Sequence, residues 1–187
     1  MKTITSLTFL LLVLISCKNP VPKKTPQQPL NVESIIGEEG ETVLIGYLNR
    51  ANLNLPEFQA WFKPEYENIK IPEGWSAKYL SLAENLEFNF FLGTWYGHTQ
   101  CELGGMFKLF NILGRSEDQI EIYPVSEYKD SPLIYEKEFD ILNISTLIFI
   151  EDGNELNRIV EFSIKSLVEN FSKILKKLPY EDLYVDF

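Results

Sequence analysis

The sequence predicts an α/β fold in which helices cover both faces of a mixed central sheet. Strand-like and helix-like segments alternate between residues 87 and 141, as in strands joined by crossover helices. The dipeptide Asp152-Gly153 separates two apolar stretches, which indicates an antiparallel β-hairpin. An amphipathic helix is expected at 163–177, directly after the hairpin. Together these observations predict three layers, with the sheet in the middle.

The first 17 residues have the composition of a bacterial export signal. Lys2 precedes an apolar stretch at 7–15, and Leu14-Ile15-Ser16-Cys17 resembles a bacterial lipobox. The apolar stretch is too short to span a bilayer, which takes roughly 20 residues. We therefore expect a signal peptide at 1–16, cleaved before Cys17, which then carries the lipid. A plain secretory signal with an incidental cysteine is the alternative.

Residues 17–32 are expected to form the lipidated end and a proline-rich tether. Four prolines among Lys, Asn, Gln and Thr cannot bury a core and favour extended chain. At about 3.1 Å per residue, such a tether would hold the domain roughly 45 Å from the lipid. Anionic headgroups would attract Lys18, Lys23 and Lys24, although a solvated spacer with incidental lysines explains them equally well.

The remaining part of the chain, 33–187, is acidic and suits one globular domain. Without Lys2 and the three tether lysines, 13 Lys and Arg stand against 27 Asp and Glu, about −14, compared with −10 for the whole chain. Phosphate backbones would repel such a domain, which argues against a nucleic-acid partner. With Cys17 lipidated, Cys101 has no partner for an intrachain disulfide, even in an oxidising compartment.

An extension up to about residue 86 precedes the main fold. Residues 41–50 alternate enough for an early strand or hairpin arm. Residues 56–68 predict a helix, which Pro64 should end or kink, and a second short helix is expected at 76–85. The first of these helices would carry three aromatic side chains on one side: Phe58, Trp61 and Phe62.

The main fold begins with the near-continuous apolar run at 87–92, which predicts a strand buried on both faces. The expected elements after it are a helix at 97–113, a strand at 119–125, a helix or helical turn at 133–141, hairpin strands at 146–150 and 155–162, and the closing helix at 163–177.

Two segments carry a resemblance to the thioredoxin superfamily. The stretch from Phe90 to Cys101, FFLGTWYGHTQC, resembles the turn where that family places Trp-Cys-x-x-Cys between a strand and a helix. The stretch NISTLIF at 143–149, followed by Asp152-Gly153 and Arg-Ile-Val at 158–160, is similar to the family's Ile-Pro-Thr strand, turn and strand.

With Leu48-Asn49-Arg50 and the helix around Phe58 to Phe62, these segments resemble the thioredoxin-like (TlpA-like) lipoproteins that some bacteria export. The similarity covers about residues 43–178. It implies a thioredoxin-like three-layer α/β/α sandwich with a mixed central sheet and an N-terminal helical extension.

The resemblance also implies that the active site is degenerate. Tyr96 would stand at the nucleophilic cysteine and Thr99 at the resolving cysteine, and neither a phenol nor an alcohol can exchange disulfides as a thiolate does. Ser145 would stand at the family's cis-proline position. Because a non-proline cis bond costs about 2.5–4 kcal/mol, we expect the Ile144-Ser145 bond to be trans. No proton-shuttling carboxylate is expected, since the corresponding stretch is Phe90-Phe91-Leu92.

Other polar and aromatic residues near the turn leave alternatives open. Cys101 lies about 140° around the helix from Tyr96, so an inert thiol is expected, with a sensor or intermolecular-disulfide role as the alternative. His98 without a second ligand is a poor metal site, although Glu102 could join it. Trp95 and Tyr96 are either a packed lid over the strand end or an exposed aromatic pair that binds a partner.

The favoured function is that of a non-catalytic, lipid-anchored protein of the bacterial cell envelope that faces the periplasm. A groove near Trp95, with Tyr96, His98 and Ser145, would bind a peptide or protein partner. No cofactor, metal or nucleic acid is expected, and the bilayer is contacted through the anchor. The alternatives are a thiol-disulfide oxidoreductase or thiol sensor that uses Cys101, and an envelope protein with a purely structural role.

Overall fold

A four-stranded mixed sheet in the order β4-β3-β5-β6 forms the centre of the molecule. The structure, a computed structural model, describes residues 20–22, 32–115, 119–132, 134–161 and 164–180. β3 pairs in parallel with β4 and antiparallel with β5, and β5 pairs antiparallel with β6. The strands are β3 (Leu86–Leu92), β4 (Ile120–Pro124), β5 (Thr146–Glu151) and β6 (Asn154–Val160).

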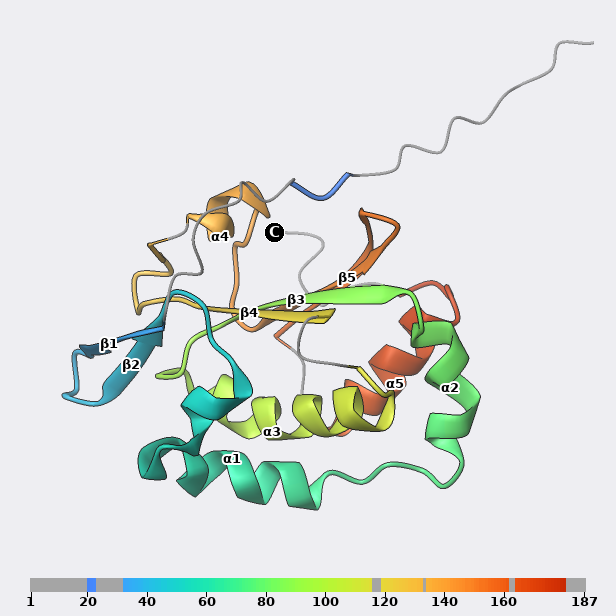
Figure 1. The fold of residues 1–187 in the computed structure, drawn as a ribbon, viewed down its shortest axis with the longest axis horizontal. Coiled ribbons are helices and arrows are strands. Elements are labelled where there is room, and N and C mark those ends of the chain that lie inside the picture. The colour runs from blue at the N-terminus through green and yellow to red at the C-terminus, as the bar shows by residue number, and fades with distance from the viewer. Residues whose placement is uncertain (1–19, 23–31, 116–118, 133, 162–163, 181–187) are drawn as a thin grey trace, which may run out of the picture.

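Helices cover the two faces of this sheet unequally. α3 (Gly97–Ile112), α5 (Ile164–Leu175) and α2 (Trp75–Ala83) lie on one face, and α1 (Pro56–Asn68) packs outside α3 as a further layer (Figure 1). The other face carries the short helix α4 (Tyr135–Glu138). The strand order, the strand directions and the helix that follows β3 make this a thioredoxin-like α/β fold, as the sequence predicted.

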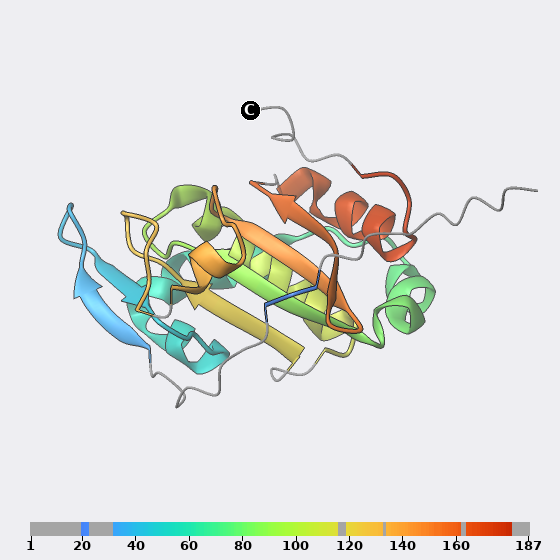
Figure 2. The ribbon, with the colours of Figure 1, turned by 90° about the horizontal axis from the view of Figure 1, so that it is seen from above.

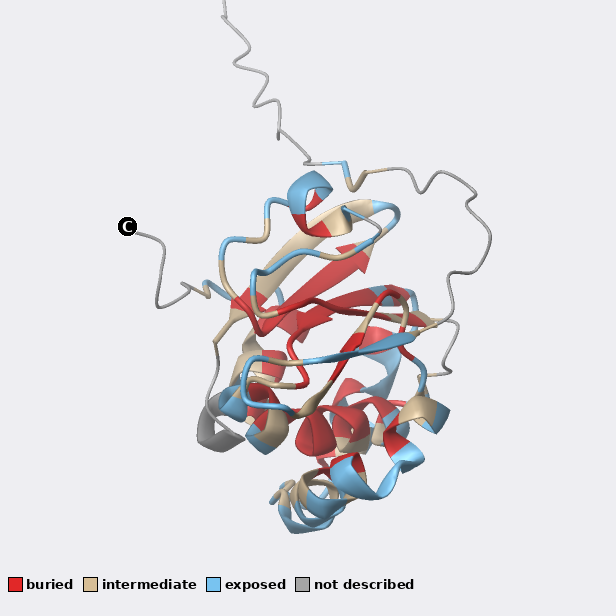
Figure 3. Cartoon of the chain, turned by 90° about the vertical axis from the view of Figure 1, so that its left-hand side faces the viewer, coloured by how far each residue is buried: buried red, intermediate tan, exposed pale blue. Residues whose placement is uncertain are grey.

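The two faces of β3 lead into two separate cores. Phe88 and Phe90 face the helices, where the ring of Phe88 lies 4.9 Å from that of Phe110 in α3. Phe91 faces the other way, and its ring stacks on that of Tyr123 at 4.9 Å. Successive side chains of a strand point to opposite faces, so an apolar run is needed where both faces are buried. Figure 3 shows the inner strands of the sheet mostly as buried, whereas the edge strand β6 (Asn154–Val160) is mostly intermediate.

A separate two-stranded sheet precedes the main fold and leads to its edge. β1 (Glu33–Ile36) pairs antiparallel with β2 (Thr42–Ile45), which realises the strand predicted within 41–50. After β2, the backbone N–H of Leu48 donates to the carbonyl of Ile122 at 3.0 Å. The chain therefore runs along the outer edge of β4 and covers part of it, before a 3-10 helix (η1, Arg50–Asn54) leads into α1.

The helix predicted at 56–68 is confirmed as α1, but Pro64 does not end it. Pro64 removes the bond that its own N–H would make to the carbonyl of Ala60. Both residues are exposed, so water can satisfy that carbonyl. The helix therefore continues through the proline while its other side packs on α3.

The Asp152-Gly153 hairpin is confirmed, with φ of 53° and 71° at these two residues, as a type I′ turn requires. The helix predicted at 133–141 is reduced to the four residues of α4. Ile134 and Asp140, with φ of 52° and 53°, flank it in the left-handed conformation, which a right-handed helix cannot include.

The N-terminal segment is described only in part. Val21 donates its N–H to the carbonyl of Gly153 at 3.1 Å and packs on the smaller core, so this piece of the predicted tether lies on the β5–β6 hairpin. Figure 2 shows it passing over the sheet. The predicted signal peptide, Cys17, most of the tether, and residues 133 and 162–163 of predicted elements lie outside the described residues. Nowhere in the described ranges is there a helix with the length and apolarity to span a membrane.

Gly104 allows α1 and α3 to approach closely, and its replacement tests this packing. A Cβ at Gly104 would lie 2.5 Å from both the carbonyl oxygen of Phe62 and the amide nitrogen of Tyr66. We expect Gly104→Ala to lower the free energy of unfolding by about 2 to 3 kcal/mol, since backbone cannot move aside as a side chain can. Urea denaturation measures this.

The matched control is Gly97→Ala, at the first position of the same helix, where a Cβ meets nothing within 4 Å. It should change stability by less than about 1 kcal/mol. Equal effects of the two substitutions would contradict the close approach.

Candidate functional site

The turn between β3 and α3 folds the Trp95 indole back over the strand end. A Cβ at Gly93 would lie 2.7 Å from the Trp95 Nε1, so only glycine leaves room for the ring. The indole N–H donates to the carbonyl of Val125 at 3.1 Å, just after β4. Trp95 is half-buried. Of the two alternatives for Trp95, the geometry is that of a packed lid which leaves part of the ring accessible.

Tyr96 and His98 extend the row of rings from Trp95 toward solvent. The Tyr96 ring lies 5.5 Å from that of Trp95 and stacks on the His98 imidazole at 5.1 Å, with 9° between the planes. Tyr96 is half-buried and His98 is exposed. Burial, followed by the charges of Glu161 and Glu102, raises the pKa of Tyr96, which keeps its phenol neutral. These three rings, Trp95, Tyr96 and His98, are referred to below as the aromatic row.

The two residues that the resemblance places at the resolving-cysteine and cis-proline positions, Thr99 and Ser145, contact each other inside the protein. Thr99 and Ser145 are both 0% exposed, and their hydroxyl oxygens lie 2.7 Å apart in a hydrogen bond. The carbonyl of Ser145 accepts from the N–H of Glu161 at 2.9 Å. The two hydroxyls thus satisfy each other inside the protein.

The peptide bond between Ile144 and Ser145 is cis, so the expectation of a trans bond was wrong. That expectation rested on the intrinsic preference of an isolated peptide unit. In the folded protein the conformation of Ser145 is also determined by its contacts, with the hydroxyl bonded to Thr99 and the carbonyl bonded to Glu161.

Glu102 is a buried acid next to this pair that the sequence reading did not place there. It is 2% exposed, and its Oε2 has no hydrogen-bond partner. Burial, and then the charge of Glu161, raises its pKa to about 8. The sequence held one signal for the burial of Glu102. It lies three residues after Thr99, and residues with that spacing share a face of a helix. The approach of Glu161 from the end of β6 was visible only in the structure.

The combination of His98 and Glu102 is not formed, since the imidazole is exposed, the carboxylate is buried and no ion pair joins them. Cys101 is a free, exposed cysteine, whereas Thr99 on the same helix is buried. Its chemical role stays a prediction. Within the described part of the chain, no group of three or more His, Cys, Asp and Glu residues is arranged to hold a metal ion.

Comparisons with known proteins identify similar folds only. No family model matches the chain, and neither does any curated protein. A Pseudomonas aeruginosa protein of unknown function superposes with a TM-score of 0.49 at 13% identity, over 67% of this chain and 86% of that one. Oxidised mitochondrial thioredoxin 3 from Saccharomyces cerevisiae superposes with a TM-score of 0.34 at 15% identity, over 58% of this chain and 98% of that one.

A double-mutant cycle tests the buried hydroxyl pair. Thr99→Val should lower the free energy of unfolding by about 1 to 3 kcal/mol, because the Ser145 hydroxyl is then buried without a partner. The further change Ser145→Ala removes that unpaired group, so the double variant should lose clearly less than the sum of the single losses. Strict additivity in chemical denaturation would show that the two hydroxyls do not interact.

The buried Glu102 predicts an unusual pH dependence of stability. Its folded pKa of about 8 lies above the ordinary value of 4.5, so the folded state binds more protons between these two values. Stability from this group is therefore fully present below about pH 4.5 and is lost as the pH rises toward 8. Glu102→Gln should abolish this loss and gain on the order of 3 kcal/mol over the native protein at pH 7.

Unfolding measured from pH 4 to 9 checks this pH dependence. Glu161→Gln is the informative second variant, because without its charge the decline should end at a lower pH. A difference between Glu102→Gln and the native protein that stays constant over the whole range would contradict the assignment.

Proposed function

We propose that this chain is a thioredoxin-fold lipoprotein of the bacterial cell envelope that does not exchange disulfides and binds a peptide or protein partner at the aromatic row. The observation that carries the proposal is the buried hydrogen bond between Thr99 and Ser145. It occupies the two positions that the thioredoxin resemblance assigns to the resolving cysteine and the cis-proline.

The loss of exchange follows from the chemistry at the start of α3. Disulfide exchange needs a thiolate that attacks and a second thiol that resolves the mixed disulfide. Tyr96 offers a phenol whose pKa is raised, and the Thr99 hydroxyl is bonded to Ser145. Neither group supplies sulfur chemistry, and the exposed Cys101 lies away from the buried pair.

The binding role is supported by the accessible part of the aromatic row. Trp and Tyr are enriched at the centres of protein interfaces, where rings bury a large area with few rotatable bonds. Here Trp95 is fixed by its bond to the Val125 carbonyl, and Tyr96 is held between Trp95 and His98. A row fixed in this way loses little conformational entropy when a partner binds. Ser145 is fully buried and bonded to Thr99, so it offers no surface of its own to a partner.

The envelope location and the lipid anchor rest on the lipobox-like sequence before Cys17 and on the resemblance to exported lipoproteins. The acidic composition agrees with a protein partner better than with a nucleic acid.

Site-specific crosslinking in cells tests the binding role. A photoreactive benzoylphenylalanine in place of exposed His98 should form a covalent adduct with a protein partner. The same group in place of Leu80, which is 47% exposed on α2, should not form that adduct. Adding Trp95→Ala to the first protein should reduce the adduct at least fivefold, because the row loses its fixed ring. An adduct that persists undiminished, or that forms equally from position 80, would contradict the role of the row.

The alternative function, a thiol oxidoreductase or sensor, has the exposed Cys101 in its favour. Insulin reduction by the native protein and by Cys101→Ser separates the two functions. We expect no turnover from either protein, since with Cys17 lipidated no second thiol remains to resolve a mixed disulfide. Catalytic turnover that Cys101→Ser abolishes would overturn the non-catalytic part of the proposal.

A further inference from the structure

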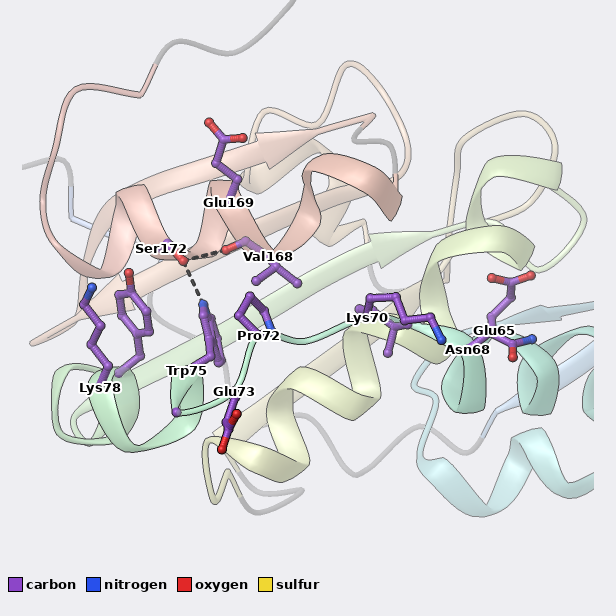
Figure 4. A pocket seen from close by; sticks show the side chains of 13 residues that line it. Glu65, Asn68, Lys70, Pro72, Glu73, Trp75, Lys78, Val168, Glu169 and Ser172 are labelled. Atoms are coloured by element: carbon purple, nitrogen blue, oxygen red, sulfur yellow. Dashed lines mark hydrogen bonds between the residues drawn. The ribbon is translucent and has the colours of Figure 1, made fainter.

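A groove of about 810 Å³ lies at the opposite end of α3 from the aromatic row (Figure 1). The end of α1, the segment 69–74, α2 and α5 enclose it (Figure 4). Its volume is within the range of small-molecule sites, roughly 300 to 1,000 Å³. Nothing in the proposed function uses this groove, so an inference about it stands independently.

The floor of the groove is apolar because its polar atoms are satisfied internally. Trp75 and Tyr79 are only 5% and 4% exposed, and their rings lie 4.9 Å apart. The Trp75 indole N–H donates to the Ser172 hydroxyl at 2.8 Å, which in turn donates to the carbonyl of Val168 at 2.7 Å. The surface left for a ligand is ring and aliphatic carbon, to which Val168 and Pro72 contribute. The hydrocarbon part of a ligand fits such a surface.

One end of the groove is positively charged. Lys78 lines the groove, and Lys176 lies just outside its lining, beside Tyr79. Their ammonium groups lie 5.6 and 5.3 Å from the centre of the Tyr79 ring, and neither forms an ion pair with a described carboxylate. Glu169 is paired with Lys173 at 2.8 Å. A hydrogen bond with Ser172, then a hydrogen bond with Lys176 and the charges of Lys176 and Lys78, lower the pKa of Tyr79 against the opposing effect of burial.

Three acids line the groove, and Glu65 lies at the end away from Lys78 (Figure 4). In Figure 4 the carboxylates of Glu73 and Glu169 point away from the strip between Trp75 and Val168. Two cations that pair with no carboxylate of the described residues are notable in a chain of net charge −10. The ammonium groups of Lys78 and Lys176 can together bind the negatively charged carboxylate of a ligand.

We propose that this groove binds a single-chain amphiphilic carboxylate of the fatty-acid class. The carboxylate lies between Lys78 and Lys176, and the hydrocarbon chain lies over Trp75 and Val168. Both halves of the ligand then meet their complement, because the apolar floor excludes water from the chain and the two ammonium groups compensate the negative charge.

Calorimetric titration of the purified protein with three probes of equal chain length tests the proposal. The protein carries Cys17→Ser so that no attached lipid competes, and the probes stay below their micelle concentrations. Dodecanoate should bind saturably, and dodecanol and dodecyltrimethylammonium should bind at least tenfold more weakly. Lys78→Gln with Lys176→Gln should weaken dodecanoate at least tenfold, whereas arginine at both positions should retain it.

Two further variants locate the site. Lys108→Gln removes a lysine that lies 4.9 Å over the ring of Tyr66, outside the groove, and should leave dodecanoate affinity unchanged. Val168→Trp fills the groove and should abolish binding, with circular dichroism as the check on folding. The proposal is overturned if dodecanoate does not bind saturably, if dodecanol binds as tightly, if the double glutamine variant retains full affinity, or if folded Val168→Trp still binds.

Discussion

The register between β3 and β5 is the constraint on which the candidate site depends. Phe91 of β3 pairs with Thr146 of β5, so Ser145 comes to lie beside the end of β3. The turn after β3 starts α3 there, and the first buried residue of that helix, Thr99, meets Ser145 at 2.7 Å. Because β3 is paired on both edges and buried on both faces, this register cannot slip by one residue without exposing a core.

The same constraint explains the buried acid. α3 lies between the sheet and α1, so nearly all of its inner turns are enclosed, and Glu102 is enclosed with them. β6 then brings Glu161 close enough to raise the pKa of Glu102 further. The stretch Phe90-Phe91-Leu92 offers no carboxylate that could take up a proton. Glu102 nevertheless places a buried protonatable group in α3, close to the turn.

The two ends of α3 differ in chemistry. Near its start, the negative charge of Glu161 lies close to the buried acid Glu102 and to the fixed rings of the aromatic row. Near its other end, α2 and α5 place Lys78 and Lys176 around a floor of aromatic rings. The fold thereby separates two surfaces for which we propose different ligands, a polypeptide at one end and an anionic amphiphile at the other.

Local patterns in the sequence determined the kind and order of the secondary structure. The apolar run of β3, the helical spacing in α1 and the Asp152-Gly153 turn depend on neighbours along the chain, and all three are found in the structure. Intrinsic preferences misled at Pro64 and at the Ile144-Ser145 bond, because contacts with solvent and with distant residues decide those positions.

The sequence by itself determined that Tyr96 and Thr99, which the resemblance to thioredoxins places at the two cysteine positions, carry no thiol. Only the tertiary structure decided what these residues contact. The Thr99–Ser145 bond, the burial of Glu102 beside Glu161, and the groove between α2 and α5 each join segments that are tens of residues apart. Such contacts depend on how the layers pack in three dimensions. The spacing of residues within one segment does not reveal that packing.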